Sequence, residues 1–132
     1  MECPLHLVCI SDTHNLHRHY GRAPWGTIPL GDLLIHAGDV TTDGTEQEVE
    51  TFLRWFSQQP HRYKVWIAGN HDRCLEASPP PAVEGVTYLC NSGTCVAGLR
   101  LWGSPYTPAH QDFAFQLHTP AQAVACWADI PD

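Results

Sequence analysis

Three short polar clusters in this chain carry residue types that bind divalent metals and move protons. The clusters are Asp12-Thr13-His14, Gly38-Asp39 and Gly69-Asn70-His71-Asp72. Carboxylates, an amide oxygen and imidazoles are typical ligands of manganese, iron or zinc. Two such metals about 3.5–4 Å apart clamp a phosphoryl group and activate a water molecule for in-line attack. The residue types therefore indicate a site for metal-assisted phosphoryl chemistry.

Each cluster has a simpler interpretation when it is taken alone. An isolated Asp-x-His pair is common at loop ends, Asp39 alone is explained by a turn, and His71 alone is more often a solvated histidine than a catalyst. Three such motifs in this order, each directly after an apolar run, would rarely occur together by chance. We therefore take them as one site, and we interpret His17 and His19 as surface loop residues.

The three apolar runs before the clusters predict short β-strands. The predicted strands are Leu5–Ser11, Asp32–His36 and Tyr63–Ala68. Ligands of α/β proteins gather beyond the carboxyl ends of the strands, so the clusters converge on one crevice if the strands are parallel neighbours. We expect Asp12 and His14 to point the same way, because side chains alternate along extended backbone. We expect Gly38 and Gly69 to let the chain turn sharply as it leaves its strand.

A helix is predicted between the second and third strands. Thr45 begins a capping-box pattern with Glu48, and Pro60 ends the segment. An apolar stripe at helical spacing is formed by Val49, Phe52, Leu53 and Phe56. Strand, helix and strand in this order predict a parallel βαβ unit.

The second half of the chain is predicted to contain short strands and one helix. The strands are Thr87–Leu89, Thr94–Val96 and Leu99–Trp102, and Gly98 is expected to turn a hairpin between the last two. The helix is expected to start at Pro120, with Thr119 as its cap.

Composition limits the class of protein. A length of 132 residues suits one domain, which we place at residues 1–132. No run of about 20 apolar residues exists, so we expect no membrane span. The net charge of −7 argues against strong nucleic-acid binding. The start of the chain does not resemble a signal peptide, and we therefore expect a soluble cytoplasmic protein.

The motifs resemble those of the calcineurin-like metallophosphoesterase superfamily, whose order is D-x-H, G-D, G-N-H-(D/E), H and G-H-x-H. The first three are present, and the surrounding segments are similar to the metallophosphoesterase-domain-containing (239FB-like) branch. Those segments are HAGDVTTDGT, VWIAGNHD, YLCNSG and LRLWGSPYTP. The resemblance extends from Leu5 to Pro131. It implies an α/β fold, a four-layer sandwich with mixed β-sheets, and hydrolysis of phosphomonoesters or phosphodiesters.

Position by position, the resemblance implies four metal ligands. Asp12 and His14 would bind the first metal, and Asn70 would bind the second. Asp39 would bridge the two. The implied cofactors are two divalent metal ions, manganese, iron or zinc, and the implied substrate is a phosphate ester or nucleotide.

The resemblance also implies catalytic roles for His71 and Asp72. His71 would contact the phosphate and protonate the leaving oxygen, which is general acid catalysis. Asp72 would support His71, and we expect it to orient the imidazole through the second ring nitrogen.

The family's last two histidine motifs have no counterpart in this sequence. We therefore expect a C-terminally truncated domain with one ligand missing from the first metal and two from the second. An exposed sheet edge would then offer a surface for self-association. The alternative to an active enzyme is a catalytically silent form that binds metal or nucleotide weakly, or modulates a full-length partner. A purely structural metal protein is disfavoured by the open ligand set.

Overall fold

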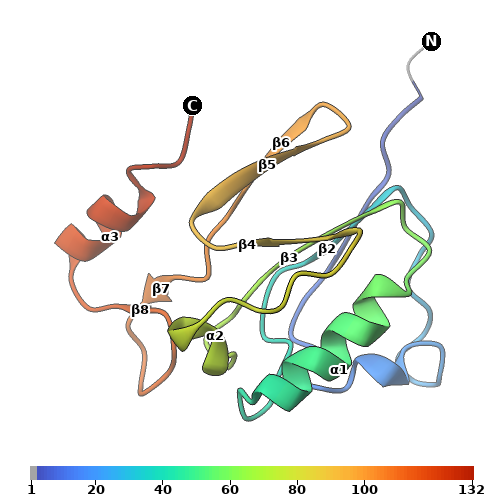
Figure 1. Cartoon of the computed structure of the whole chain (residues 1–132), viewed down its shortest axis with the longest axis horizontal. Coiled ribbons are helices and arrows are strands. Elements are labelled where there is room, and N and C mark those ends of the chain that lie inside the picture. The colour runs from blue at the N-terminus through green and yellow to red at the C-terminus, as the bar shows by residue number, and fades with distance from the viewer. Residues whose placement is uncertain (1–2) are drawn as a thin grey trace.

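The main sheet contains four parallel strands in the order β1-β2-β3-β4 (Figure 1). In this computed structural model, which describes residues 3–132, the strands are Leu7–Ile10, Leu33–His36, Tyr63–Ile67 and Val86–Leu89. Residues 1 and 2 of the expected domain lie outside the described part. The three strands predicted before the polar clusters are confirmed, each slightly shorter than expected. Because all three are parallel neighbours, their carboxyl ends lie at one edge of the sheet.

Helix α1 (Glu46–Ser57) packs against one face of this sheet (Figure 1). Thr45 is its N-cap, and both capping-box bonds form: Glu48 N donates to Thr45 Oγ1 at 3.2 Å, and Thr45 N donates to Glu48 Oε1 at 3.3 Å. All four residues of the predicted apolar stripe are buried in the core with Leu34 and Trp66. Burying each such side chain contributes about 1.5–3 kcal/mol. The predicted βαβ unit is therefore confirmed.

A hairpin covers part of the opposite face of the sheet. Strands β5 (Ser92–Val96) and β6 (Leu99–Gly103) pair antiparallel, and Val96 packs in a second core cluster with Leu33, Val65 and Leu89. The two turn residues, Ala97 and Gly98, have φ values of 48° and 82°. Positive φ at both positions is the geometry of a tight hairpin turn, which confirms the prediction for Gly98. The structure thus combines parallel and antiparallel sheets in one α/β fold.

The remaining elements are short. Helix α3 (Pro120–Trp127) begins after the Thr119 cap, as predicted. Four elements were not predicted: the 3-10 turn η1 (His17–His19), α2 (Cys74–Ala77), β7 (Thr107–Pro108) and β8 (Gln116–Leu117). None is long enough to show a periodic sequence pattern. Within residues 3–132, no helix is both long and apolar enough to cross a bilayer.

The interpretation of His17 as a surface residue is wrong. Turn η1 folds its side chain beneath the loop, where it is completely buried, although His19 is exposed. The His17 ring lies 5.1 Å from the Trp55 ring and 6.0 Å from the Phe52 ring. Burial lowers the pKa of His17 to about 4, and the positive charge of Arg18 acts in the same direction. The folded protein therefore holds this histidine neutral.

Acidification is expected to destabilise the fold between pH about 6.5 and about 4. Burial also lowers the pKa of His36 to about 4. In this window the unfolded chain binds protons that the folded chain does not, so the free energy of unfolding falls as the pH falls. Each such proton contributes about 1.4 kcal/mol per pH unit. Asp72, whose pKa is raised by burial, acts in the opposite direction.

The variant His17→Phe isolates one of these protons, because phenylalanine keeps the aromatic packing and cannot titrate. Urea unfolding of both proteins, measured from pH 4 to 7.5 in EDTA, should show a shallower pH dependence for the variant. Equal slopes for the two proteins would contradict the assignment.

Candidate metal centre

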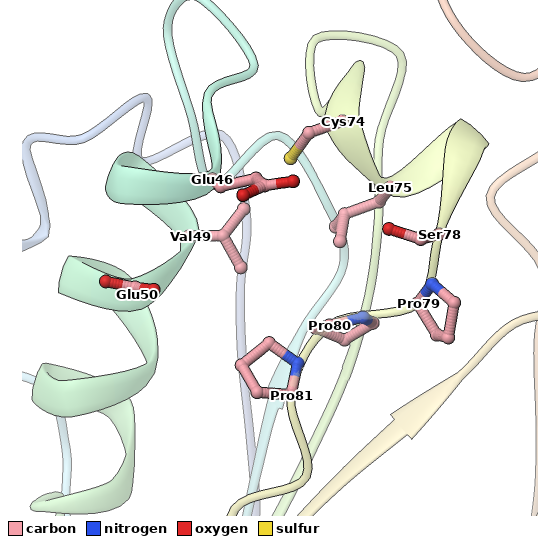
Figure 2. Close-up of a pocket in the computed structure, with 9 residues that line it drawn as sticks. All are labelled: Glu46, Val49, Glu50, Cys74, Leu75, Ser78, Pro79, Pro80 and Pro81. Atoms are coloured by element: carbon pink, nitrogen blue, oxygen red, sulfur yellow. The ribbon is translucent and has the colours of Figure 1, made fainter.

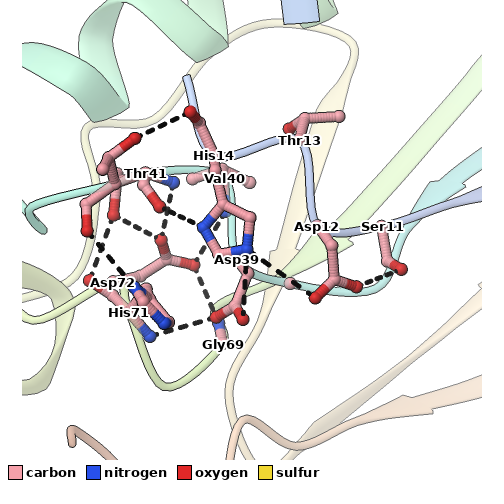
Figure 3. A network of polar contacts seen from close by, with 12 residues as sticks. Ser11, Asp12, Thr13, His14, Asp39, Val40, Thr41, Gly69, His71 and Asp72 are labelled. Atoms are coloured by element: carbon pink, nitrogen blue, oxygen red, sulfur yellow. Dashed lines mark hydrogen bonds and ion pairs between the residues drawn. The ribbon is translucent and has the colours of Figure 1, made fainter. Parts of the chain in front are cut away.

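The loops after β1 and β2 run side by side at the carboxyl edge of the sheet. Asp12 N donates to Gly38 O at 2.9 Å, and His14 N donates to Asp39 O at 3.0 Å. These backbone bonds hold the Asp-x-His motif directly against the Gly-Asp motif (Figure 3). The predicted convergence of the two motifs therefore results from main-chain pairing beyond the strands.

The backbone at this junction is strained. Four non-glycine residues have positive φ: Asp12 at 56°, His14 at 41°, Asn15 at 64° and Asp39 at 58°. The expected extended backbone for Asp12 and His14 is therefore wrong, because the chain turns to follow the neighbouring loop. Their side chains still meet. Such residues cost about 1–3 kcal/mol each and concentrate at functional sites.

The side chains of the two motifs form a cluster of potential metal donors. His14 Nε2 lies 3.8 Å from Asp12 Oδ1 and 3.8 Å from Asp39 Oδ2. Donor atoms of His14, Asp39 and His71 all lie within 4.8 Å of one another. Ligands that share one ion, each about 2.1 Å from it, are at most about 4 Å apart. The separations of 3.8 Å from His14 Nε2 to the two carboxylates fall within that reach, so Asp12, His14 and Asp39 fit a divalent metal.

Both histidines of the cluster have their Nδ1 atoms fixed by carbonyl groups. His14 Nδ1 lies 2.9 Å from Thr41 O, and His71 Nδ1 lies 3.2 Å from Thr42 O. A carbonyl can only accept, so each Nδ1 carries the hydrogen and each neutral ring keeps its lone pair on Nε2. Metal-binding histidines are typically oriented in this way. Thr41 and Thr42 could not be identified from the sequence, because they act through their main-chain carbonyls.

Asp72 does not orient His71 as predicted. Its buried carboxylate accepts hydrogen bonds from Gly69 N at 2.8 Å, Thr41 N at 2.9 Å, Thr41 Oγ1 at 2.7 Å and Val40 N at 3.2 Å. The two oxygens are thus turned toward the backbone, and the His71 ring bonds a carbonyl instead. Desolvation raises the pKa of Asp72, and these hydrogen bonds offset part of that rise. Asp72 joins the loop after β2 to the loop after β3.

Two glycines allow the loops to approach each other. Gly38 has a φ of 103°, which confirms its predicted role in a sharp turn. Gly69 has a different role: a Cβ atom there would clash with Asp39 Oδ1. The missing side chain lets Asp39 reach the third motif, where its Oδ1 accepts a hydrogen bond from His71 N at 3.0 Å.

A hollow of about 190 Å³ lies beside these donors. It is lined by Asp12, Asp39 and Asn70, and on its other side by Ser104, Pro105 and Thr107. Asn70 therefore borders the same space as Asp12 and Asp39. The residues after β6 belong to the segment LRLWGSPYTP, which carries part of the family resemblance but none of the three polar clusters, and the chain fold brings them to the site.

A second hollow, of about 280 Å³, lies between α1 and the Pro79–Pro81 segment (Figure 2). Glu46 and Cys74 line it, but it shares no lining residue with the hollow beside Asp39. Among residues 3–132, the His14, Asp39 and His71 group is the one cluster of three potential charged or imidazole ligands. The candidate metal site is therefore at the sheet edge.

Comparisons with known proteins agree with this assignment. The model of the calcineurin-like phosphoesterase family matches residues 5–125. Metallophosphoesterase domain-containing protein 1 of Homo sapiens is 32% identical over 95% of the chain, and a UPF0046 protein of Caenorhabditis elegans is 33% identical over 97%. A protein of Emericella nidulans named probable rhamnogalacturonate lyase C is 41% identical over 95% of the chain.

The chain spans half the length of these relatives or less. It covers 48% of the Caenorhabditis elegans protein, 44% of the human protein and 12% of the Emericella nidulans protein. The activities of those longer proteins therefore cannot be assigned directly to this chain. The matched region nevertheless includes all three polar clusters and the loops that hold them.

Proposed function

Because this chain belongs to the calcineurin-like phosphoesterase family, we propose that it hydrolyses phosphomonoesters or phosphodiesters at a centre of two divalent metals. The observation that supports this most strongly is the 3.8 Å separation of His14 Nε2 from both Asp12 and Asp39. It places an imidazole lone pair between two carboxylates. Manganese, iron and zinc all accept this donor set.

The proposed ligands are assigned to two metals that share Asp39. Asp12 and His14 are the proposed ligands of the first metal. Asn70, which borders the same hollow as Asp12 and Asp39, is the proposed ligand of the second. Asp39 is the proposed bridge, because its Oδ2 lies near His14 Nε2 and its Oδ1 accepts from the third motif. When bound, the metals would polarise the phosphoryl group and activate a water molecule. The chain itself holds the donors in place through the backbone bonds of the first two loops.

His71 is the proposed proton donor. Its Nδ1–H donates to Thr42 O, so Nε2 takes no part in that hydrogen bond. Once protonated, His71 can give the Nε2 proton to the oxygen of the leaving group. Proton transfer of this kind contributes about 10²–10⁴-fold to rate.

Hydrolysis of bis-p-nitrophenyl phosphate and p-nitrophenyl phosphate by the metal-free chain, with and without added Mn²⁺, tests the proposal. We expect turnover that depends on Mn²⁺ and is abolished by EDTA. The ratio of the two rates reports the preference for diesters over monoesters. Absence of turnover with both substrates, from folded protein that binds Mn²⁺, would contradict the proposed activity.

That negative outcome would favour a second candidate function. One side of β1 is unpaired in the sheet, and Leu7 of that strand is 48% exposed. An open, partly apolar strand edge is a template for pairing with another chain. The second candidate is therefore a catalytically silent, metal-binding protein that associates through β1 with itself or with a longer relative.

A further inference from the structure

A segment from late in the chain lies against the third polar cluster. Ala114 N donates to Asn70 O at 3.0 Å, and Phe115 N donates to Glu76 Oε2 at 2.6 Å. The two bonds fix residues 112–115 alongside residues 70–76. Phe115 and Glu76 are 39 residues apart in the sequence, and neither belongs to a β-strand.

Side chains of residues 112–115 also pack against side chains of residues 70–76. The Phe113 ring lies 5.0 Å from the His71 ring, at an interplanar angle of 34°. The Arg73 guanidinium lies 5.8 Å from the centre of the Phe113 ring, and its Nη2 donates to Asp112 O. Arg73 therefore contacts both the ring of Phe113 and the backbone beside it. Phe113 is in turn placed against the imidazole.

The late segment is anchored firmly enough to act as a support. Ala114 and Phe115 are each 2% exposed and belong to the main core cluster. Phe115 also packs edge-to-face on Tyr106, with ring centres 5.4 Å apart. Phe113 is thus followed directly by two core residues, so its backbone cannot move far without disturbing the core.

The His71 ring has few other restraints. One bond to Thr42 O holds its Nδ1, at the long distance of 3.2 Å, and the His14 ring contacts it edge-on with centres 4.7 Å apart. The torsion that turns a histidine ring is broad. A flat ring packed at a fixed angle narrows that torsion, and displacement of a catalytic group by about 1 Å can cost about 100-fold in rate.

From these contacts we propose that Phe113, held by Arg73, is a positioning residue for His71. The ring packs against the imidazole and keeps Nδ1 directed at Thr42 O, so that Nε2 stays directed at the reacting phosphate. The proposal rests on the proposed function, in which His71 is the proton donor. It assigns a role to a residue that lies outside the three metal-site motifs.

The first test measures His71 itself and needs no turnover. Nitrogen NMR of ¹⁵N-histidine-labelled, metal-free protein distinguishes the two ring tautomers. We expect neutral His71 to be the Nδ1–H tautomer in the unmodified chain and a mixture of tautomers in Phe113→Ala. Phe113→Tyr should restore the single tautomer, and Trp127→Ala, which removes an aromatic ring from α3, should leave it unchanged. An unaltered His71 signal in Phe113→Ala would overturn the proposal.

The second test measures catalysis with the same variants. We expect Phe113→Ala to lower kcat for bis-p-nitrophenyl phosphate about 10- to 100-fold, and Phe113→Tyr to retain most of it. The Kd for Mn²⁺ should change less than about twofold, because Phe113 contacts no proposed ligand. Unchanged kcat in an active protein would overturn the proposal. An inactive unmodified chain would count against the proposed function alone, and the NMR result would still decide the positioning role.

Phe113→Leu covers the case in which alanine disrupts the fold. Leucine keeps apolar volume at this position but not a flat ring, so the proposal expects an intermediate loss of kcat and partial mixing of tautomers. Arg73→Ala should reproduce the Phe113→Ala effect in weaker form. The double variant should be less than additive, because the two residues support His71 as one unit. Full additivity would contradict that coupling.

Discussion

Replacing Asp39 with asparagine is expected to weaken Mn²⁺ binding by at least about 100-fold. Loss of a residue that merely supports a metal ligand costs 10- to 100-fold in affinity, and Asp39 is a proposed ligand of both ions. Its Oδ2 lies 3.8 Å from His14 Nε2. Removing the charge removes the donor shared by the two halves of the site. Isothermal titration calorimetry of the metal-free protein measures the effect.

Asparagine tests the role of the Asp39 carboxylate more specifically than alanine, for two reasons. Asp39 has a φ of 58°, and asparagine adopts such backbone more readily than alanine. Its amide oxygen can also accept the hydrogen bond that Asp39 Oδ1 receives from His71 N. The loop is therefore expected to keep its shape, and the change in affinity reports the lost carboxylate.

Asp43→Asn provides the matched control. Asp43 is an exposed aspartate in the same loop, and it does not belong to the donor cluster. The control should bind Mn²⁺ as the unmodified chain does. Equal affinity in Asp39→Asn and Asp43→Asn would refute the bridging role of Asp39.

The elements that position the site were predictable because their signals are local. Thr45 and Glu48 lie three residues apart, and the α1 stripe repeats at a fixed spacing, so burial on one face follows directly. The three strands were visible as apolar runs, and the helix between the second and third predicted that these two are parallel. The polar clusters were located by the strands that precede them.

The details of the site depend on contacts that no local pattern encodes. Asp72 was expected to bond the His71 ring, but its burial between two loops directs it to backbone N–H groups. His17 was misplaced because a short 3-10 turn, rather than sequence polarity, decides its burial. Phe113 reaches His71 only after the chain has passed through β4, the β5–β6 hairpin and β7. In each case the tertiary structure overrides the tendency of the residue type.

His71→Ala is expected to lower turnover by about 10²–10⁴-fold, the usual contribution of a general acid. Mn²⁺ affinity should change little if His71 serves as the proton donor. The loss should also depend on the leaving group. A nitrophenolate ion departs readily without a proton, whereas a phenolate or alkoxide ion does not. Turnover of a phenyl or alkyl phosphodiester should therefore fall further than turnover of bis-p-nitrophenyl phosphate.

The opposite pattern would identify His71 as a metal ligand. Its donor atom lies within 4.8 Å of those of His14 and Asp39, and its Nε2 lone pair is free when Nδ1 bonds Thr42 O. Loss of Mn²⁺ affinity in His71→Ala, with turnover restored by excess Mn²⁺ and no dependence on the leaving group, would refute the proton-donor role. His19→Ala, a change at an exposed histidine of η1, should alter neither quantity. As a proton donor, Nε2 contacts the leaving oxygen, and as a ligand it contacts the metal. Mn²⁺ affinity and the dependence on the leaving group therefore distinguish the two roles.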